Sequence, residues 1–370
     1  MLSGNKIPRV IYVKSLTYFR QALYFLNQLK KIHTFLWHIF LRIGKIVHRN
    51  HYPKVANILK KCEGESTMQS FDYYWKLTRP HTLPASVIPA VFGVCFAIYA
   101  EGVFHPLLAI IMVLCAALIQ IATNLFNEYF DFKNGLDTEE SVGIGGAIVR
   151  EGISPRSVLL AAFALYALCG ILGIILAANS SWWLLVIGAI CLVIGYCYTG
   201  GPYPISRTPY GELFAGFLFG SGFSMIAYFT QTGHVTLYSF AASLPLVMLV
   251  GLLLTANSLR DRIADKAHGR RTLAILLGHD RTVLFMIFGF TFCYVWLFVL
   301  LSYGMNLFVL LPLLSILYAI NCINAYHYSK GKSPKKMMRG MMYCSKTLKN
   351  FGLLYIIAIL IQALFHVILN

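Results

Sequence analysis

Two short polar segments share a pattern in which an asparagine is followed four residues later by an aspartate. The pairs are Asn127/Asp131 and Asn257/Asp261, and Asp265 extends the second pair by one more helical turn. A spacing of four residues places side chains on one face of a helix. Amide and carboxylate oxygens suit Mg²⁺, which is usually also bound by the phosphate oxygens of a substrate. The spacing therefore predicts two oxygen-lined helix faces that hold Mg²⁺ against a phosphorylated substrate.

Acidic residues are rare in this chain, which makes their placement informative. The 370 residues include 14 Asp and Glu and 31 Lys and Arg, yet five of the acids fall within residues 127–141. Solvated helix ends would explain one acidic cluster. Two matched clusters are better explained by a shared ligand.

The elements that carry these segments are long apolar stretches. Hydrophobic residues make up 58% of the chain, and the mean hydropathy is +0.67, so the expected solvent is a lipid bilayer. About twenty apolar residues in a helix span the roughly 30 Å of hydrocarbon. We predict an all-α multi-pass membrane protein with nine transmembrane helices, near residues 82–101, 104–126, 156–177, 181–199, 212–231, 237–258, 283–302, 306–326 and 350–368.

The positive charge is distributed unevenly between the predicted loops. The four loops on one side, at 101–105, 178–182, 232–236 and 302–306, contain no Lys or Arg, whereas the loops on the other side contain many. Because Lys and Arg concentrate in cytoplasmic loops, we expect a plasma-membrane protein with a cytoplasmic N-terminus and an external C-terminus. The net charge of +17 then reflects topology and attraction to membrane lipid, and we expect no nucleic-acid partner.

The two polar segments occupy equivalent places in this topology. They lie at the cytoplasmic ends of the second and sixth predicted spans. Four spans separate them, so an internal repeat of four helices would bring the two oxygen-lined faces opposite each other. Ionisable groups at membrane depth are costly to bury and are therefore functional candidates.

The N-terminal residues differ from the rest of the chain. Residues 1–62 contain no acid, and twelve Lys or Arg fall within 1–67, as in an interfacial helix or a targeting segment. Met68 opens the stretch MQSFDYYWKLTRPHTLPAS, which reads as a cytoplasmic start directly before the first span. We therefore divide the chain into a basic extension at 1–67, which we hypothesise to be a translated leader, and a transmembrane domain at 68–370.

Four ordered blocks resemble those of the UbiA superfamily of intramembrane prenyltransferases. They are RPHTLPAS (79–86), NEYFDFKNGLDTEESVGIGGAIVREG (127–152), YTGGPYPIS (198–206) and NSLRDRIADKAHGRRTLAILLG (257–278). The resemblance runs from about Tyr74 to Leu369 and implies nine transmembrane helices around a central cavity that opens to the cytoplasmic side. It implies an enzyme that transfers a polyprenyl group from polyprenyl diphosphate to an aromatic acceptor, with Mg²⁺ as cofactor.

Within the superfamily, the chain is similar to the branch that prenylates 1,4-dihydroxy-2-naphthoate in menaquinone biosynthesis. Asp137 follows Asp131 by six residues with Gly135 between them, whereas the hydroxybenzoate branch has an Asp four residues on. Glu128 departs from the superfamily, in which an Asp commonly occupies this position. This branch implies that the acceptor loses its carboxyl group as CO₂ and that the product is demethylmenaquinol.

The resemblance also implies roles for individual residues. The implied Mg²⁺ ligands are Asn127, Asp131, Asp261 and Asp265, with Asn257 and Asp137 as helpers, and the catalytic acids are Asp131, Asp261 and Asp265. The implied substrate-binding residues are Arg79, Lys133, Arg150, Tyr198 and Arg260. For the basic residues a topology-determining loop charge is an alternative explanation, and for the tyrosine a place in the interfacial aromatic belt.

Two other functions remain as alternatives. One is a related prenyltransferase that acts on homogentisate, 4-hydroxybenzoate or haem. The other is a cation-coupled transporter, which would carry acids near mid-span and broken helices in inverted repeats. Here the acids lie at span ends, so the sequence favours the prenyltransferase.

Overall fold

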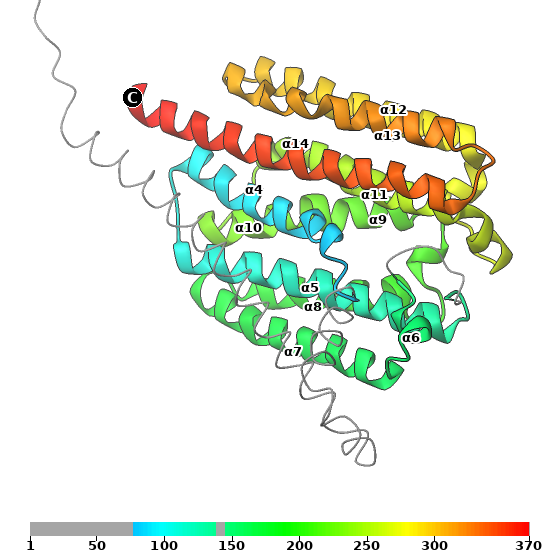
Figure 1. Cartoon of the computed structure of the whole chain (residues 1–370). Helices are drawn as coiled ribbons and strands as arrows, with labels where there is room; N and C mark the ends of the chain where they lie inside the picture. Colours follow the sequence, from blue (N-terminus) through cyan, green and yellow to red (C-terminus); the bar gives the residue numbers. More distant parts are fainter. Residues whose placement is uncertain (1–76, 138–144, 370) are drawn as a thin grey trace, which may run out of the picture.

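The chain folds into a bundle of long helices. The computed structural model describes residues 77–137 and 145–369, and within these ranges every regular element is helical. The predicted extension at 1–67 lies outside the described residues. The long helices, which lie roughly along one common direction (Figure 1), are α4 Pro84–Glu101, α5 Pro106–Lys133, α7 Pro155–Asn179, α8 Trp183–Thr199, α10 Phe223–Thr232, α11 Leu237–Ala267, α12 Leu273–Ser302, α13 Ile316–Tyr328 and α14 Pro334–Leu369.

Short helical elements complete the bundle. The short elements are η1 Pro80–Thr82, α6 Ala147–Arg150, η2 Ile205–Arg207, α9 Gly211–Ala215, the π-helix η3 Gly216–Gly222 and η4 Leu307–Ser315. Among the described residues, eight helical stretches are long and apolar enough to cross a membrane, and α8 is a further apolar helix of 17 residues. The predicted all-α multi-pass class is confirmed, and the fourth predicted span, near residues 181–199, corresponds to this shorter helix.

Four helices extend well beyond the predicted spans. α5 continues to Lys133 and α11 to Ala267, whereas α12 begins at Leu273 instead of near residue 283 and α14 at Pro334 instead of near residue 350. Hydropathy falls at the first polar residues, but a helix satisfies its own backbone groups and can continue past the hydrocarbon. As a result, the polar segments that follow Asn127 and Asn257 lie on rigid helices.

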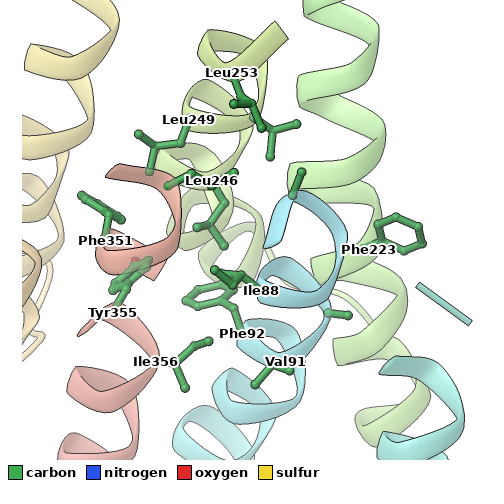
Figure 2. Close-up of a cluster of buried hydrophobic side chains, with 14 of the residues drawn as sticks. Ile88, Val91, Phe92, Phe223, Leu246, Leu249, Leu253, Phe351, Tyr355 and Ile356 are labelled. Atoms are coloured by element: carbon green, nitrogen blue, oxygen red, sulfur yellow. The ribbon is translucent and has the colours of Figure 1, made fainter. Parts of the chain in front are cut away.

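The largest apolar core joins α4, α11 and α14. Figure 2 shows Phe92 of α4 and Tyr355 of α14 side by side, with their ring centroids 4.8 Å apart in a stacked arrangement. The Tyr355 hydroxyl donates a hydrogen bond to the Ala242 carbonyl of α11 at 2.9 Å, which satisfies its polar atom inside the core. This core thus holds α11, the helix that carries the second polar segment, against α4 and α14.

A small residue lets α4 approach α10 closely. The Ser224 hydroxyl of α10 donates to the Pro89 carbonyl of α4 at 3.1 Å. A Cβ atom added to Gly93 would lie 2.1 Å from the Ser224 carbonyl oxygen, a distance that no side chain tolerates. Close backbone contact of this kind is typical of helix packing in membranes.

A second apolar cluster fixes the C-terminal end of α5. Phe126 is fully buried, and its ring packs edge to face against Tyr166 of α7 and Tyr196 of α8, at centroid distances of 5.0 and 5.5 Å. Because Phe126 directly precedes Asn127, this packing determines the direction in which the first polar face points.

Candidate active site

The two polar segments meet through one arginine. Arg270, in the loop between α11 and α12, donates from Nη2 to Asp131 Oδ1 at 2.6 Å and from Nη1 to Asp265 Oδ1 at 3.1 Å. Burial acts to lower the pKa of Arg270, but the two carboxylates outweigh it, so the pKa is raised and the guanidinium stays charged. The ends of α5 and α11 are therefore joined by a buried ionic bridge.

A polar cavity of about 170 Å³ lies beside this bridge. Six of the residues predicted from the sequence line it: Arg79, Asn127, Asp131, Tyr198, Asn257 and Asp265. Hydroxyl groups of Thr123, Thr199 and Thr272 add to the lining, and each is buried without a hydrogen-bond partner among the described residues. Buried polar atoms are seldom left unpaired, so the cavity is suited to a polar ligand.

Asp261 and Arg260 form a separate pair next to the cavity. Arg260 Nε donates to Asp261 Oδ1 at 2.7 Å, and Nη2 donates to Oδ2 at 2.5 Å. Arg260 is only 8% exposed, and its Nη1 also donates to the sulfur of Met341 at 2.8 Å. Neither charged residue is among those that line the cavity, although Asn257 and Asp265 on the same helix are.

Glu128 turns away from the cavity and supports its rim. It is fully buried and accepts hydrogen bonds from the backbone N–H groups of Gly146 at 3.0 Å and Ile148 at 3.2 Å, and from Arg79 Nη2 at 3.3 Å. Arg79 has a φ of 49°, a left-handed conformation that is unusual for a residue other than glycine. The carboxylate thus holds α6 and the cavity-lining Arg79 in place.

The remaining predicted residues lie around the end of α5. Asp137 is half-buried, and burial together with the charges of Asp131 and Glu128 raises its pKa to about 7. Arg150 donates to the Gly145 carbonyl and lies near Asp137, whereas Lys133 is exposed. None of Asp137, Arg150 and Lys133 lines the cavity.

The donor atoms at the cavity suit a hard cation that shares its coordination with a substrate. Asn127 Oδ1 at the cavity and Asp137 Oδ2 outside its lining are both buried and have no hydrogen-bond partner among the described residues. In the same part of the chain, no three His, Cys, Asp or Glu side chains lie close enough to hold a metal ion by themselves. Amide, carboxylate and substrate oxygens together would fit Mg²⁺, which is seldom enclosed by protein ligands alone.

An apolar cavity of about 280 Å³ lies next to the polar one. It is enclosed by α5, α7, α8 and the η3–α10 segment, and Phe219 lines both cavities. Gly170, Gly173 and Gly188 contribute to its wall, and a Cβ atom added to any of them would meet nothing within 4 Å. A polar cavity that adjoins an apolar one at Phe219 suits an amphiphilic ligand with an anionic head.

Sequence reasoning missed two charged residues at this site. Arg270 lies only five positions after Asp265, but it was counted with the loop charges that determine topology. Glu212, at the start of α9, lies in a span that carries no other acid, and this isolation was the available signal.

The comparisons with known proteins identify a family. Residues 86–347 match the model of the UbiA prenyltransferase family, which confirms the resemblance seen in the sequence. The chain is 42% identical over 310 residues to the 1,4-dihydroxy-2-naphthoate octaprenyltransferase of Bacillus subtilis, covering 83% of this chain and 99% of that protein. It is 33% identical over 215 residues to the enzyme of the same name from Mycobacterium tuberculosis, covering 58% and 73%.

Solved structures agree in fold. A UbiA homologue from Archaeoglobus fulgidus, described as bound to DMAPP and Mg²⁺, superposes with a TM-score of 0.53 at 17% identity and covers 76% of this chain and 98% of that one. The apo structure of a UbiA homologue from Aeropyrum pernix gives a TM-score of 0.54 at 17% identity, with coverage of 72% and 95%. At these identities the likeness concerns the fold alone.

Proposed function

The chain belongs to the UbiA prenyltransferase family, and we propose that it transfers a polyprenyl group from polyprenyl diphosphate to 1,4-dihydroxy-2-naphthoate. The other products are CO₂ and diphosphate, and the prenylated product is demethylmenaquinol. The observation that carries this proposal is the similarity to the Bacillus subtilis naphthoate octaprenyltransferase along nearly the whole length of that relative.

The two adjoining cavities support a polyprenyl diphosphate as the donor. The diphosphate would lie in the polar cavity, where Asn127, Asp131, Asn257 and Asp265 supply oxygen ligands. The apolar cavity would take part of the isoprenoid chain. Arg270 pairs with both Asp131 and Asp265. When a cation takes the place of its guanidinium beside these two acids, Arg270 would move to the diphosphate.

Mg²⁺ bound at these oxygens would supply the positive charge that allows the diphosphate to leave from the allylic carbon. Asp261 would join the ligand set after separating from Arg260, and Asp137 would assist from the rim of the cavity. Arg79, which Glu128 holds at the cavity, would bind diphosphate or the acceptor carboxylate. Lys133, Arg150 and Arg260 are further candidates for the diphosphate, although they do not line the cavity in this structure.

The acceptor would react in the same cavity. Its electron-rich ring carbon attacks the allylic carbon as the diphosphate leaves, so no covalent bond to the enzyme is needed. The apolar wall would keep water away from the developing carbocation. Tyr198 lines the cavity and would contact one of the substrates.

The membrane-spanning helices place this reaction in a lipid bilayer. We propose the cell membrane as the location, with the N-terminus in the cytoplasm and the cavity open to the cytoplasmic side. This orientation follows from the Lys and Arg in the loops on that side.

The proposal is tested with purified protein, one polyprenyl diphosphate and a choice of acceptors. Dihydroxynaphthoate should be prenylated with release of CO₂ in the presence of Mg²⁺, and hydroxybenzoate poorly or not at all. EDTA should abolish turnover, because without a cation the carboxylates repel the diphosphate. A preference for hydroxybenzoate would show the acceptor to be wrong, and full turnover in EDTA would exclude the metal-dependent site.

A further inference from the structure

A third carboxylate lies close to the polar cavity and has no part in the function proposed so far. Glu212, in α9, is only 6% exposed. Both of its carboxylate oxygens are buried, and no Lys, Arg or His side chain pairs with them among the described residues. Burying a carboxylate that has no partner of opposite charge costs roughly several kcal/mol of folding free energy. A side chain retained at this cost inside a span is a candidate for function.

The surroundings of Glu212 connect it to the cavity. The Ser258 hydroxyl of α11 and the Leu273 backbone at the start of α12 lie near enough to stabilise its charge. Ser258 itself lines the polar cavity, whereas Glu212 does not. Ser258 therefore adjoins both the polar cavity and the Glu212 carboxylate.

Part of the wall of the polar cavity carries hydroxyl groups. The residues that carry them include Tyr198, Thr199, Ser206, Ser258 and Thr272. Both Thr199 Oγ1 and Thr272 Oγ1 are buried and unpaired among the described residues. Hydroxyl groups bind hydroxyl groups well, whereas they do not neutralise a diphosphate. This wall is thus better matched to a hydroxylated ring than to the head of the donor.

We propose that Glu212, acting through Ser258, accepts the hydroxyl proton of the aromatic acceptor while the new carbon–carbon bond forms. This inference rests on the proposed function, because it requires an acceptor with a ring hydroxyl. Ser258 would donate its own proton to Glu212 and take the proton of the acceptor. Glu212 is then a positioning and proton-holding residue, and Ser258 is the group that touches the substrate.

The proton and electron balance closes without another reactant. The ring carbon that bears the carboxylate attacks the allylic carbon, the C–O bond to diphosphate breaks, and the diphosphate leaves with the electron pair. Loss of the hydroxyl proton to Glu212 turns that C–O group into a ketone next to the carboxylate. CO₂ then leaves, its bonding pair restores the aromatic ring, and the oxygen takes the proton back. One carboxylate that stores one proton is sufficient.

The test compares acceptors of different hydroxyl acidity in wild-type protein and in Glu212→Gln. With dihydroxynaphthoate the variant should lose about 100-fold in kcat, a size typical of general acid–base groups. With a fluorinated naphthoate whose hydroxyl is already ionised at the assay pH, the loss should shrink to less than about fivefold, because no proton has to be removed. Glu101→Gln is the matched control, because Glu101 lies at the opposite end of the bundle, where it accepts from Tyr228 at 2.9 Å.

An equal loss with both acceptors would overturn the inference, since a merely structural Glu212 would not discriminate between them. Ser258→Ala keeps the carboxylate and should show the same dependence on acceptor acidity, so it carries the test if Glu212→Gln does not fold. If wild-type protein prefers another hydroxylated arene, the proposed acceptor is wrong, and the same comparison is made with that arene. Undiminished turnover of dihydroxynaphthoate in Glu212→Gln would exclude the role.

Discussion

Asp131 and Asp265 come from helices that are far apart in sequence, yet both bind the same guanidinium. Arg270 donates to them at 2.6 and 3.1 Å, so each acid is held at a defined position beside the polar cavity. If these acids bind the cation in the presence of substrate, each acts on charge that develops in the transition state. Their effect should then be much larger on turnover than on folding.

The first prediction concerns these two acids. Asp131→Asn and Asp265→Asn keep the size of the side chain and remove its charge. Each should lower kcat by about 100-fold or more, which corresponds to roughly 3 kcal/mol of transition-state stabilisation. Asp280→Asn is the control, because Asp280 is exposed and paired only with Lys330, and it should retain activity within about threefold. Equal losses in all three variants would mean that the acids of the cavity only solvate helix ends.

The second prediction concerns Arg270 in the metal-free protein. Arg270→Gln leaves the carboxylates of Asp131 and Asp265 without their shared counter-ion. Breaking a buried ion pair costs about 3–5 kcal/mol, so the melting temperature in EDTA should fall by several degrees. With Mg²⁺ in excess the difference from wild type should become smaller, because the cation takes over the same charges. A decrease that is equal in EDTA and in Mg²⁺ would show that the two do not share the site.

Single residues of the site could be predicted from the sequence where they depend on local helical spacing, and not where they depend on contacts between distant segments. The spacing of Asn127 and Asp131 is a local helical property, and both residues line the cavity. The hydrogen-bond partners of Glu128 could not be predicted. Its carboxylate accepts from the backbone N–H groups of Gly146 and Ile148, and this contact depends on a loop that returns to α5. Similarly, the spacing of Asp261 and Asp265 could not reveal that the Asp261 carboxylate pairs with the adjacent Arg260.

The helices hold the site through contacts that leave no room for larger side chains. α4 lies against α10 at Gly93, and η3 lies against α11 at Gly220, where an added Cβ would be 2.5 Å from the Val247 Cα. The bounds of α5 and α11 could not be predicted from hydropathy, since both helices continue through polar residues. The apolar positions within the spans were predictable, because the bilayer demands them regardless of which helix is the neighbour.

The third prediction compares two glycines in spans. Gly93→Ala should destabilise the protein by about 1–3 kcal/mol, because a methyl group there collides with the Ser224 carbonyl of α10. Gly188→Ala should be neutral or slightly stabilising, because its Cβ meets nothing within 4 Å and alanine favours a helix by about 1 kcal/mol. Thermal unfolding in detergent measures both. A stable Gly93→Ala variant would contradict the close approach of α4 and α10.

The molecule as a whole separates a charged end from an apolar interior. Arg270, α6 and the end of α5 lie at one end of the bundle, and the apolar cavity lies among the spans beyond them. The anionic head of a polyprenyl diphosphate matches the charged end of the bundle, and its isoprenoid tail matches the apolar interior. The all-helical class and the number of apolar segments were predictable, because each span carries its own signal. The proximity of the two cavities at Phe219 was not predictable, since it depends on how η3 packs against the neighbouring helices.

The final prediction concerns topology, which determines from which side the substrates arrive. If the eight candidate spans among the described residues and the 17-residue α8 all cross the membrane, the two ends of the transmembrane domain lie on opposite sides. Lys332, between α13 and α14, should lie in the cytoplasm because the Lys and Arg cluster around it favours that side. Val235, before α11, should lie outside and is exposed in the structure.

The measurement uses Val235→Cys and Lys332→Cys, each made in a background without exposed cysteines. In intact cells, a membrane-impermeant thiol reagent should label Val235→Cys but not Lys332→Cys, and cell lysis should make both reactive. Labelling of Lys332→Cys in intact cells would place the polar cavity on the outer face and remove a cytoplasmic supply of both substrates.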